Sequence, residues 1–161
     1  MSTPLQGVTV VTALACALVA GVFFAFSTAV MTALDRQPGV QGMTAMQEVN
    51  RVIVNPAFML AFAGGALGCV ALAVVGVVRW GQPGSPWLVA GGLLYAIGGF
   101  GLTALANVPL NDKLDGVSPT AADAAARWSA YVSDWTAWNH VRAVASLIAA
   151  ALLIVALLAG D

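Results

Sequence analysis

Four aromatic side chains, spaced at three, four and three residues, form the clearest candidate for a ligand-binding surface in this sequence. Such spacing places side chains on a single face of a helix. That face can anchor a membrane protein at the lipid–water interface, where tryptophan and tyrosine are enriched. It can equally form one wall of a pocket, because stacked rings suit a flat aromatic ligand. The residues are Trp128, Tyr131, Trp135 and Trp138.

The segment that follows these rings holds the polar groups best suited to catalysis. Asn139, His140 and Arg142 come directly after Trp138. Histidine exchanges protons near neutral pH, so His140 is a candidate general base. It could instead be an axial haem ligand or an interfacial hydrogen-bonded side chain. Arg142 could bind an anionic or phenolate oxygen, or extend to lipid headgroups. A single histidine cannot form the usual multi-ligand metal site, so we predict no metal.

Four further amide side chains lie in pairs about one helical turn apart. Gln47 and Asn50 form one pair, and Asn107 and Asn111 form the other. An amide at membrane depth costs free energy unless it is hydrogen-bonded, so these side chains should face the interior of a bundle. They can hold helices together, at about 1 kcal/mol per hydrogen bond, or donate to a substrate oxygen. We expect five polar residues to share one cavity: Asn50, Asn107, Asn111, Asn139 and His140.

The elements that must position these residues are membrane-spanning helices. Of the 161 residues, 60% are hydrophobic and only 8% are charged, whereas a soluble domain carries about 25% charged residues. Four apolar stretches, at about 8–34, 56–78, 86–106 and 138–158, approach the roughly 20 residues that span a bilayer as a helix. Backbone groups in lipid must be paired within their own segment, so each stretch is predicted to be helical.

The predicted fold is therefore all-α: a single-domain, integral membrane four-helix bundle over residues 1–161. The connection at 79–85 contains glycine and proline and should be a tight turn. Ser118-Pro119-Thr120 predicts the start of a helix. The negative charge of Asp123 would stabilise the positive N-terminal end of the helix dipole. We therefore expect a short amphipathic helix between spans three and four, in the region from Pro119 to Trp135.

Four spans place both long connections on one side of the membrane and both termini on the other. The positive-inside rule favours a plasma-membrane protein with cytoplasmic long connections, because that side carries most of the basic residues: Arg36, Arg51, Lys113, Arg127 and Arg142. The net charge of −1 gives no attraction to nucleic acid. Cys16 and Cys69 lie inside predicted spans, where buried thiols are usually packing residues.

Four short motifs occur in order along the chain: Gly21-Val22-Phe23-Phe24-Ala25-Phe26-Ser27, Met46-Gln47-Glu48-Val49-Asn50, Asn107-Val108-Pro109-Leu110-Asn111 and Trp138-Asn139-His140-Val141-Arg142. In this order they resemble the motifs of the anthrone oxygenase family. The resemblance extends from about residue 8 to the end of the fourth span. It implies a small four-span membrane protein that oxidises anthrones to anthraquinones with molecular oxygen. No cofactor is established for that family, so none is expected here.

The resemblance also implies roles for individual residues. An anthrone is a weak carbon acid whose anion can reduce dioxygen, so the protein needs a base, donors for the anion and a dry pocket. His140 is the expected base, and Asn50, Asn139 and Arg142 are expected to hold the oxyanion. The expected substrate-binding residues are Phe23, Phe26, Gln47, Asn107, Asn111, Trp135 and Trp138. Expected partners are membrane lipid, a hydrophobic aromatic molecule, dioxygen and a second copy of the chain.

Two other classes of function fit the same residues. One is a haem- or quinone-binding redox module in which His140 is the ligand. The other is a non-catalytic protein that binds lipid or another hydrophobic ligand, in which the polar residues merely close the bundle.

Overall fold

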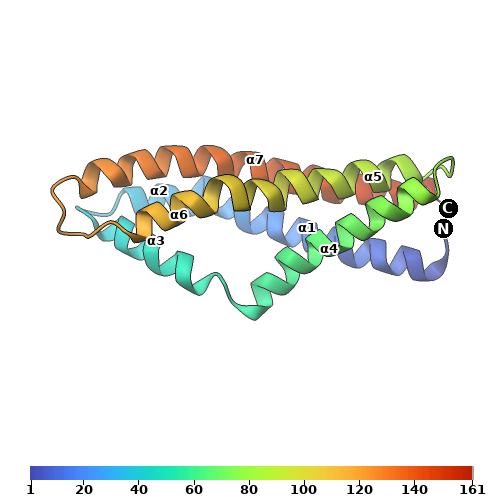
Figure 1. Ribbon diagram of the computed structural model, residues 1–161, viewed down its shortest axis with the longest axis horizontal. Helices are drawn as coiled ribbons and strands as arrows, with labels where there is room; N and C mark the ends of the chain where they lie inside the picture. Colours follow the sequence, from blue (N-terminus) through green and yellow to red (C-terminus); the bar gives the residue numbers. More distant parts are fainter. Residues whose placement is uncertain (161) are drawn as a thin grey trace.

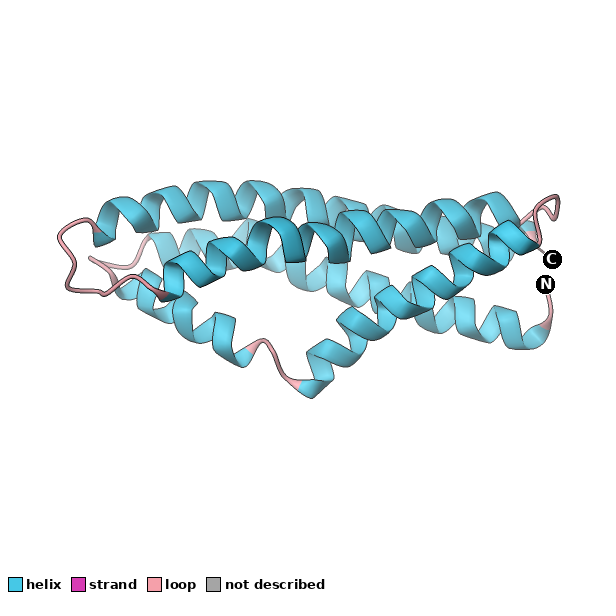
Figure 2. Cartoon of the chain, in the orientation of Figure 1, coloured by secondary structure: helices cyan, strands magenta, loops and turns pink. Residues whose placement is uncertain are grey.

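The computed structural model describes residues 1–160, and every regular element within them is helical (Figure 2). The first long helix covers residues 3–35 without a break. It consists of α1 (Thr3–Ala25), a π-helical turn η1 (Phe26–Val30) and α2 (Met31–Asp35). Two shorter helices follow, α3 (Gln41–Val52) and α4 (Pro56–Val78).

The second half of the chain contains two long helices. Residues 85–115 form a continuous helix made of α5 (Ser85–Leu94), the π-helical segments η2 (Tyr95–Gly101) and η3 (Thr103–Asn107), and α6 (Val108–Asp115). The last helix is α7 (Ala124–Ala159), whose 36 residues extend along the whole bundle (Figure 1). Pro109 is tolerated inside this continuous helix because the π-helical segment η3 directly before it readjusts the backbone hydrogen bonds.

Four of these helices are long and apolar enough to cross a membrane: Thr3–Asp35, Pro56–Val78, Ser85–Asp115 and Ala124–Ala159. This confirms a multi-pass bundle of four spans. The termini and the turn after α4 lie at one end, and the connections after α2 and α6 lie at the other (Figure 1). The N-terminal ammonium of Met1 donates to the carbonyl of Gly160 and holds the two chain ends together.

The bundle is tightly packed along the half that contains α4 and α5. Cys16 and Val19 of α1, Leu72 of α4 and Leu153 of α7 are almost fully buried there. Close approach depends on small residues, as is usual in lipid. A Cβ atom added to Gly92 would lie 2.3 Å from the Cys69 carbonyl oxygen, so α5 can approach α4 only because this position lacks a side chain.

The expected short helix between Pro119 and Trp135 is wrong. Residues 124–159 form one uninterrupted helix, because no glycine or proline interrupts this stretch. The short extra helix is α3, between spans one and two. Its Met43 and Met46 are buried against the bundle, whereas Glu48 is exposed. From the end of α2 it runs back along the bundle and meets α4 at a corner that stands away from the other helices (Figure 1).

Candidate functional site

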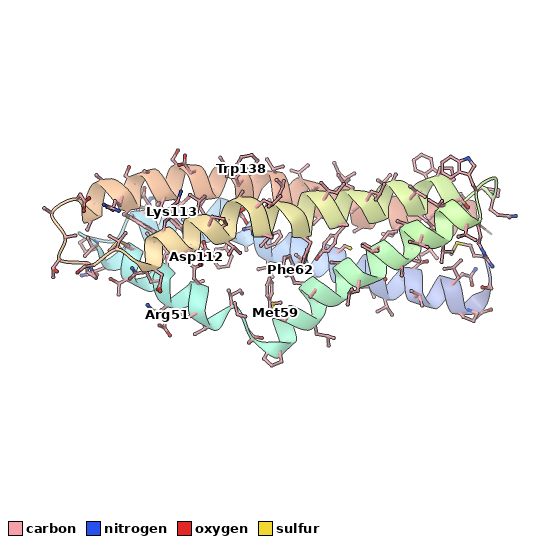
Figure 3. The ribbon with its side chains drawn as sticks, viewed as in Figure 1. Arg51, Met59, Phe62, Asp112, Lys113 and Trp138 are labelled. Carbon is pink, nitrogen blue, oxygen red and sulfur yellow. The ribbon has the colours of Figure 1, made fainter. Side chains whose placement is uncertain are left out.

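A cavity of about 240 Å³ is lined by residues of both α3 and α4. Two of its lining residues, Met59 and Phe62, are labelled in Figure 3. Its volume is close to the lower end of the range for small-molecule sites, about 300–1,000 Å³. Most of the lining is apolar or aromatic, and besides the indole N–H of Trp135 its polar side chains are Asn50, Thr103, Asn111 and Arg142. These four come from α3, η3, α6 and α7, so the site depends on the assembled bundle.

Arg142 is the most unusual residue of the cavity. Its side chain is buried, and the guanidinium lies 4.1 Å from the ring centre of Phe23 and 5.2 Å from that of Trp135. Among residues 1–160, no carboxylate pairs with this cation. The Nε atom is also buried without a hydrogen-bond partner in that range. The aromatic faces offset part of the desolvation cost, and an anionic or strongly polar ligand atom would offset more.

Asn139 fixes the position of Arg142. Its Oδ1 accepts a hydrogen bond of 2.5 Å from Nη2 of Arg142. Its Nδ2 donates to the Phe23 carbonyl and to Oγ of Ser27, both at 2.7 Å. Nη1 of Arg142 donates to Oγ1 of Thr103 at 3.0 Å. Asn139 is fully buried and does not line the cavity, so it orients the guanidinium and leaves Nε free.

Two amides complete the polar side of the cavity. Asn111 Oδ1 accepts from the Tyr131 hydroxyl at 2.9 Å and from Nε1 of Trp135 at 2.8 Å. The Asn50 amide lies close to the same hydroxyl, but its Nδ2 is buried and makes no hydrogen bond of full geometry to the described residues. Asn50 and Arg142 both line the cavity, and each carries a buried N–H donor without a hydrogen-bond partner among the described residues.

The aromatic stripe of α7 forms a wall, with one exception. Trp128, Tyr131 and Trp135 are buried and stack in sequence, with ring centres 5.7 and 6.2 Å apart. Trp135 continues this wall into the cavity, where it lies 5.8 Å from Phe26. The expectation that Trp138 joins them is wrong, because its side chain is 44% exposed on the outer side of α7 (Figure 3).

His140 also lies outside the cavity. Its side chain is exposed and is not part of the lining, so the expectation that it shares this cavity with the asparagines is wrong. Successive residues of a helix differ by about 100° in direction. Since Asn139 faces the bundle interior, the next residue must turn away from it. A haem bound by His140 would therefore lie outside the cavity.

Two other expected binding residues form hydrogen bonds between helices instead. Gln47 donates from Nε2 to the carbonyls of Leu114 and Val117, at 2.8 and 3.0 Å, and so holds α3 against the end of α6. Asn107 donates from Nδ2 to the Trp135 carbonyl at 3.1 Å. Neither lines the cavity. The expected residues that do line it are Phe23, Phe26, Asn50, Asn111, Trp135 and Arg142.

Sequence reasoning missed several residues of the site. Thr103 could have been found, because it continues the Asn107 and Asn111 series at a spacing of four residues. Phe58 and Phe62 of α4 also line the cavity. They gave no signal, since a helix that is apolar on all sides has no periodicity that distinguishes lipid-facing from bundle-facing positions.

Comparisons with known proteins identify the family. Neither the curated proteins nor the solved structures gave a match. A family model described as anthrone oxygenase matches residues 52–152, more than half of the chain. The matched region includes Asn107, Asn111, Trp135, Asn139 and Arg142, and it begins just after Asn50. With this coverage, the chain belongs to the anthrone oxygenase family.

Proposed function

We propose that this protein is a membrane oxygenase that oxidises an anthrone-like phenolic substrate with dioxygen, without a bound cofactor. The observation that carries the proposal is the buried Arg142 guanidinium, which has no carboxylate partner among residues 1–160 and lies beside an aromatic wall. Such an arrangement favours a flat ligand that carries a negatively charged oxygen. Family membership favours the anthrone class.

The substrate would bind with its ring system among the aromatic residues. Trp135 and Phe26 supply ring surfaces, and Phe23 lies beneath the guanidinium. The substrate oxygen would face the two unused donors, Nε of Arg142 and Nδ2 of Asn50. Fixed donors in a water-poor site stabilise developing negative charge more strongly than water does, because they need no reorganisation.

Dioxygen is the only oxidant that this reaction needs. Loss of a proton from the reactive CH₂ carbon leaves an anion whose charge is shared with the ring oxygen held by Arg142 and Asn50. The carbanion carbon gives an electron pair to dioxygen, a C–O bond forms, and protonation yields a hydroperoxide. The O–O bond then breaks as the remaining C–H proton and hydroxide leave as water. The carbon is left as a ketone, so CH₂ and O₂ become C=O and H₂O.

The proton acceptor in this scheme is a water molecule from the headgroup region of the membrane, because the cavity lining offers none. None of the residues that line the cavity is a carboxylate or a histidine. The chain therefore acts mainly by lowering the free energy of the substrate anion, through Arg142 and Asn50. His140 is not retained as the base, because an exposed side chain outside the cavity cannot reach the reacting carbon.

Asn50→Ala tests this proposal. The variant should fold normally, because Asn50 Nδ2 makes no hydrogen bond that would be lost. Removing one donor from an oxyanion site lowers kcat by about 10²–10³-fold. Oxygen consumption with an anthrone in detergent micelles measures the effect, and Gln82→Ala, an exposed amide at the opposite end of the bundle, is the matched control. Rates for wild type equal to those of protein-free micelles would remove the oxygenase proposal.

A non-catalytic hydrophobic-ligand-binding protein is the second candidate. The lack of a carboxylate or histidine in the cavity lining favours it. It predicts that a hydroxylated anthraquinone binds and quenches the fluorescence of Trp135, while oxygen consumption with an anthrone stays at the level of the micelles alone.

A further inference from the structure

The corner between α3 and α4 is held by one side chain. Asn55 Oδ1 accepts from the backbone N–H of Phe58 at 3.0 Å and so caps α4. Its Nδ2 donates to the carbonyl of Val52 at 3.0 Å, at the end of α3. Pro56 occupies the first turn of α4, where its missing N–H has no cost. The hydrogen bonds of Asn55 therefore join the end of α3 to the start of α4.

The corner presents apolar side chains both to the cavity and to the molecular surface. Met59 and Phe62 line the cavity (Figure 3). Val52, Val54 and Leu60, at or beside the corner, are 57%, 68% and 76% exposed. A cluster of exposed apolar side chains on a protein surface indicates a contact with lipid or another apolar partner.

The charge pattern places this corner at the boundary between water and lipid. Arg51, just before the corner, pairs with Asp115 at 2.6 Å, and both side chains are more than half exposed. This ion pair raises the pKa of the Arg51 guanidinium. After Arg51 the next charged residue is Arg79. The 23 residues of α4 extend about 34 Å at 1.5 Å per residue, and the hydrocarbon core is about 30 Å thick. The start of α4 therefore lies close to one membrane surface.

The cavity reaches the molecular surface beside this corner. Val54 belongs both to the cavity lining and to the exposed apolar surface. Val108 of α6 also lines the cavity and is 41% exposed. We define the rim as the exposed lining side chains, which are Val54 and Val108; Asn50, Thr103 and Asn111 are half-buried, and Arg142 is buried. A water-facing entrance would have polar side chains at its rim, so this rim fits an entrance from lipid.

We propose that the cavity is filled from the headgroup region of the membrane, through an opening between Val54 and Val108. The ligand class is a flat lipophilic molecule with one acidic hydroxyl or keto oxygen, which enters with that polar edge first and reaches Arg142. The nature of the ligand rests on the proposed function, whereas the route rests on the rim. A molecule of this class concentrates in the bilayer. Through the apolar rim it can pass from the bilayer into the cavity without crossing water.

The depth of the opening is tested first. Val54→Cys carries a bimane label, which reacts selectively because Cys16 and Cys69 are fully buried. In phosphatidylcholine vesicles with brominated acyl chains, its fluorescence should fall, and aqueous iodide should have little effect. Leu67→Cys, 73% exposed in the middle of α4, is the lipid control, and Ala122→Cys in the exposed connection after α6 is the water control. Quenching of the Val54 label by iodide at the level of Ala122→Cys overturns the proposal.

The entry step is tested with a dihydroxyanthraquinone added to vesicles that contain the protein. Val54→Trp places a larger side chain at the rim and narrows the opening, so it should slow association about tenfold, within the one to three decades that such variants cover. Val74→Trp on the same helix should leave the rate unchanged. Equal association rates for wild type and Val54→Trp overturn the route. Binding to wild type without oxygen consumption would instead remove the oxygenase proposal and leave the route standing, so the two failures are distinguishable.

Discussion

Replacement of Arg142 by lysine tests whether the site needs only a positive charge or also the fixed hydrogen-bond donors of the guanidinium. The guanidinium uses Nη1 for Thr103 and Nη2 for Asn139, and its Nε is buried without a hydrogen-bond partner among the described residues. A lysine ammonium is a single compact donor group at the end of a flexible chain, and it cannot serve three separated directions. Arg142→Lys therefore keeps the charge and loses the fixed donor.

The hydrogen bonds that Arg142 makes determine how much the change should lower protein stability and kcat. Side-chain hydrogen bonds in membrane proteins contribute on average about 0.6 kcal/mol, and at most about 1.7 kcal/mol. Losing the bonds to Thr103 and Asn139 should thus lower the free energy of unfolding by about 1–3 kcal/mol. Losing an oxyanion donor lowers kcat by about 10²–10³-fold, which is roughly 3–4 kcal/mol. The variant should still fold, but it should turn over slowly.

Two measurements check the prediction. Oxygen consumption with saturating anthrone in detergent gives kcat, and unfolding in a denaturing detergent gives the stability. Arg79→Lys is the matched control, because Arg79 lies at the opposite end of the bundle, in the turn that follows α4. Turnover by Arg142→Lys at the wild-type rate, in a folded protein, would show that the free Nε plays no part in the reaction.

The remaining predictions concern the two residues next to each other on α7. His140→Ala should keep kcat within about twofold of wild type, because exposed substitutions away from special features change free energies by about 0.5 kcal/mol; a loss of 10²-fold or more in oxygen consumption would restore it as the base. Asn139→Ala removes three hydrogen bonds, to Arg142, Phe23 and Ser27. It should lower the free energy of unfolding by about 2–5 kcal/mol and also reduce kcat, and wild-type stability in a denaturing detergent would contradict the network.

The sequence predicted the polar groups of the site better than their roles. Asn50 and Arg142 line the cavity as expected, because polar side chains near membrane depth must face the bundle interior. Asn139 was correctly placed in the interior, but its three hydrogen bonds leave it no atom for a substrate. His140 and Trp138 were misplaced, since residues adjacent in sequence on a helix point in different directions. The membrane orientation and the oligomeric state stay predictions.

The sequence by itself determined the number of spans and the end of the bundle at which the polar residues gather. Both follow from hydropathy and segment length, which are read along the chain. Only the tertiary structure decided that α3 runs back to meet α4 at a corner, and that Val54, Val108 and Arg142 line the same cavity. It also decided that this arginine has no carboxylate partner among residues 1–160. Such features depend on which faces of different helices meet, and uniformly apolar helices carry no periodic signal for that.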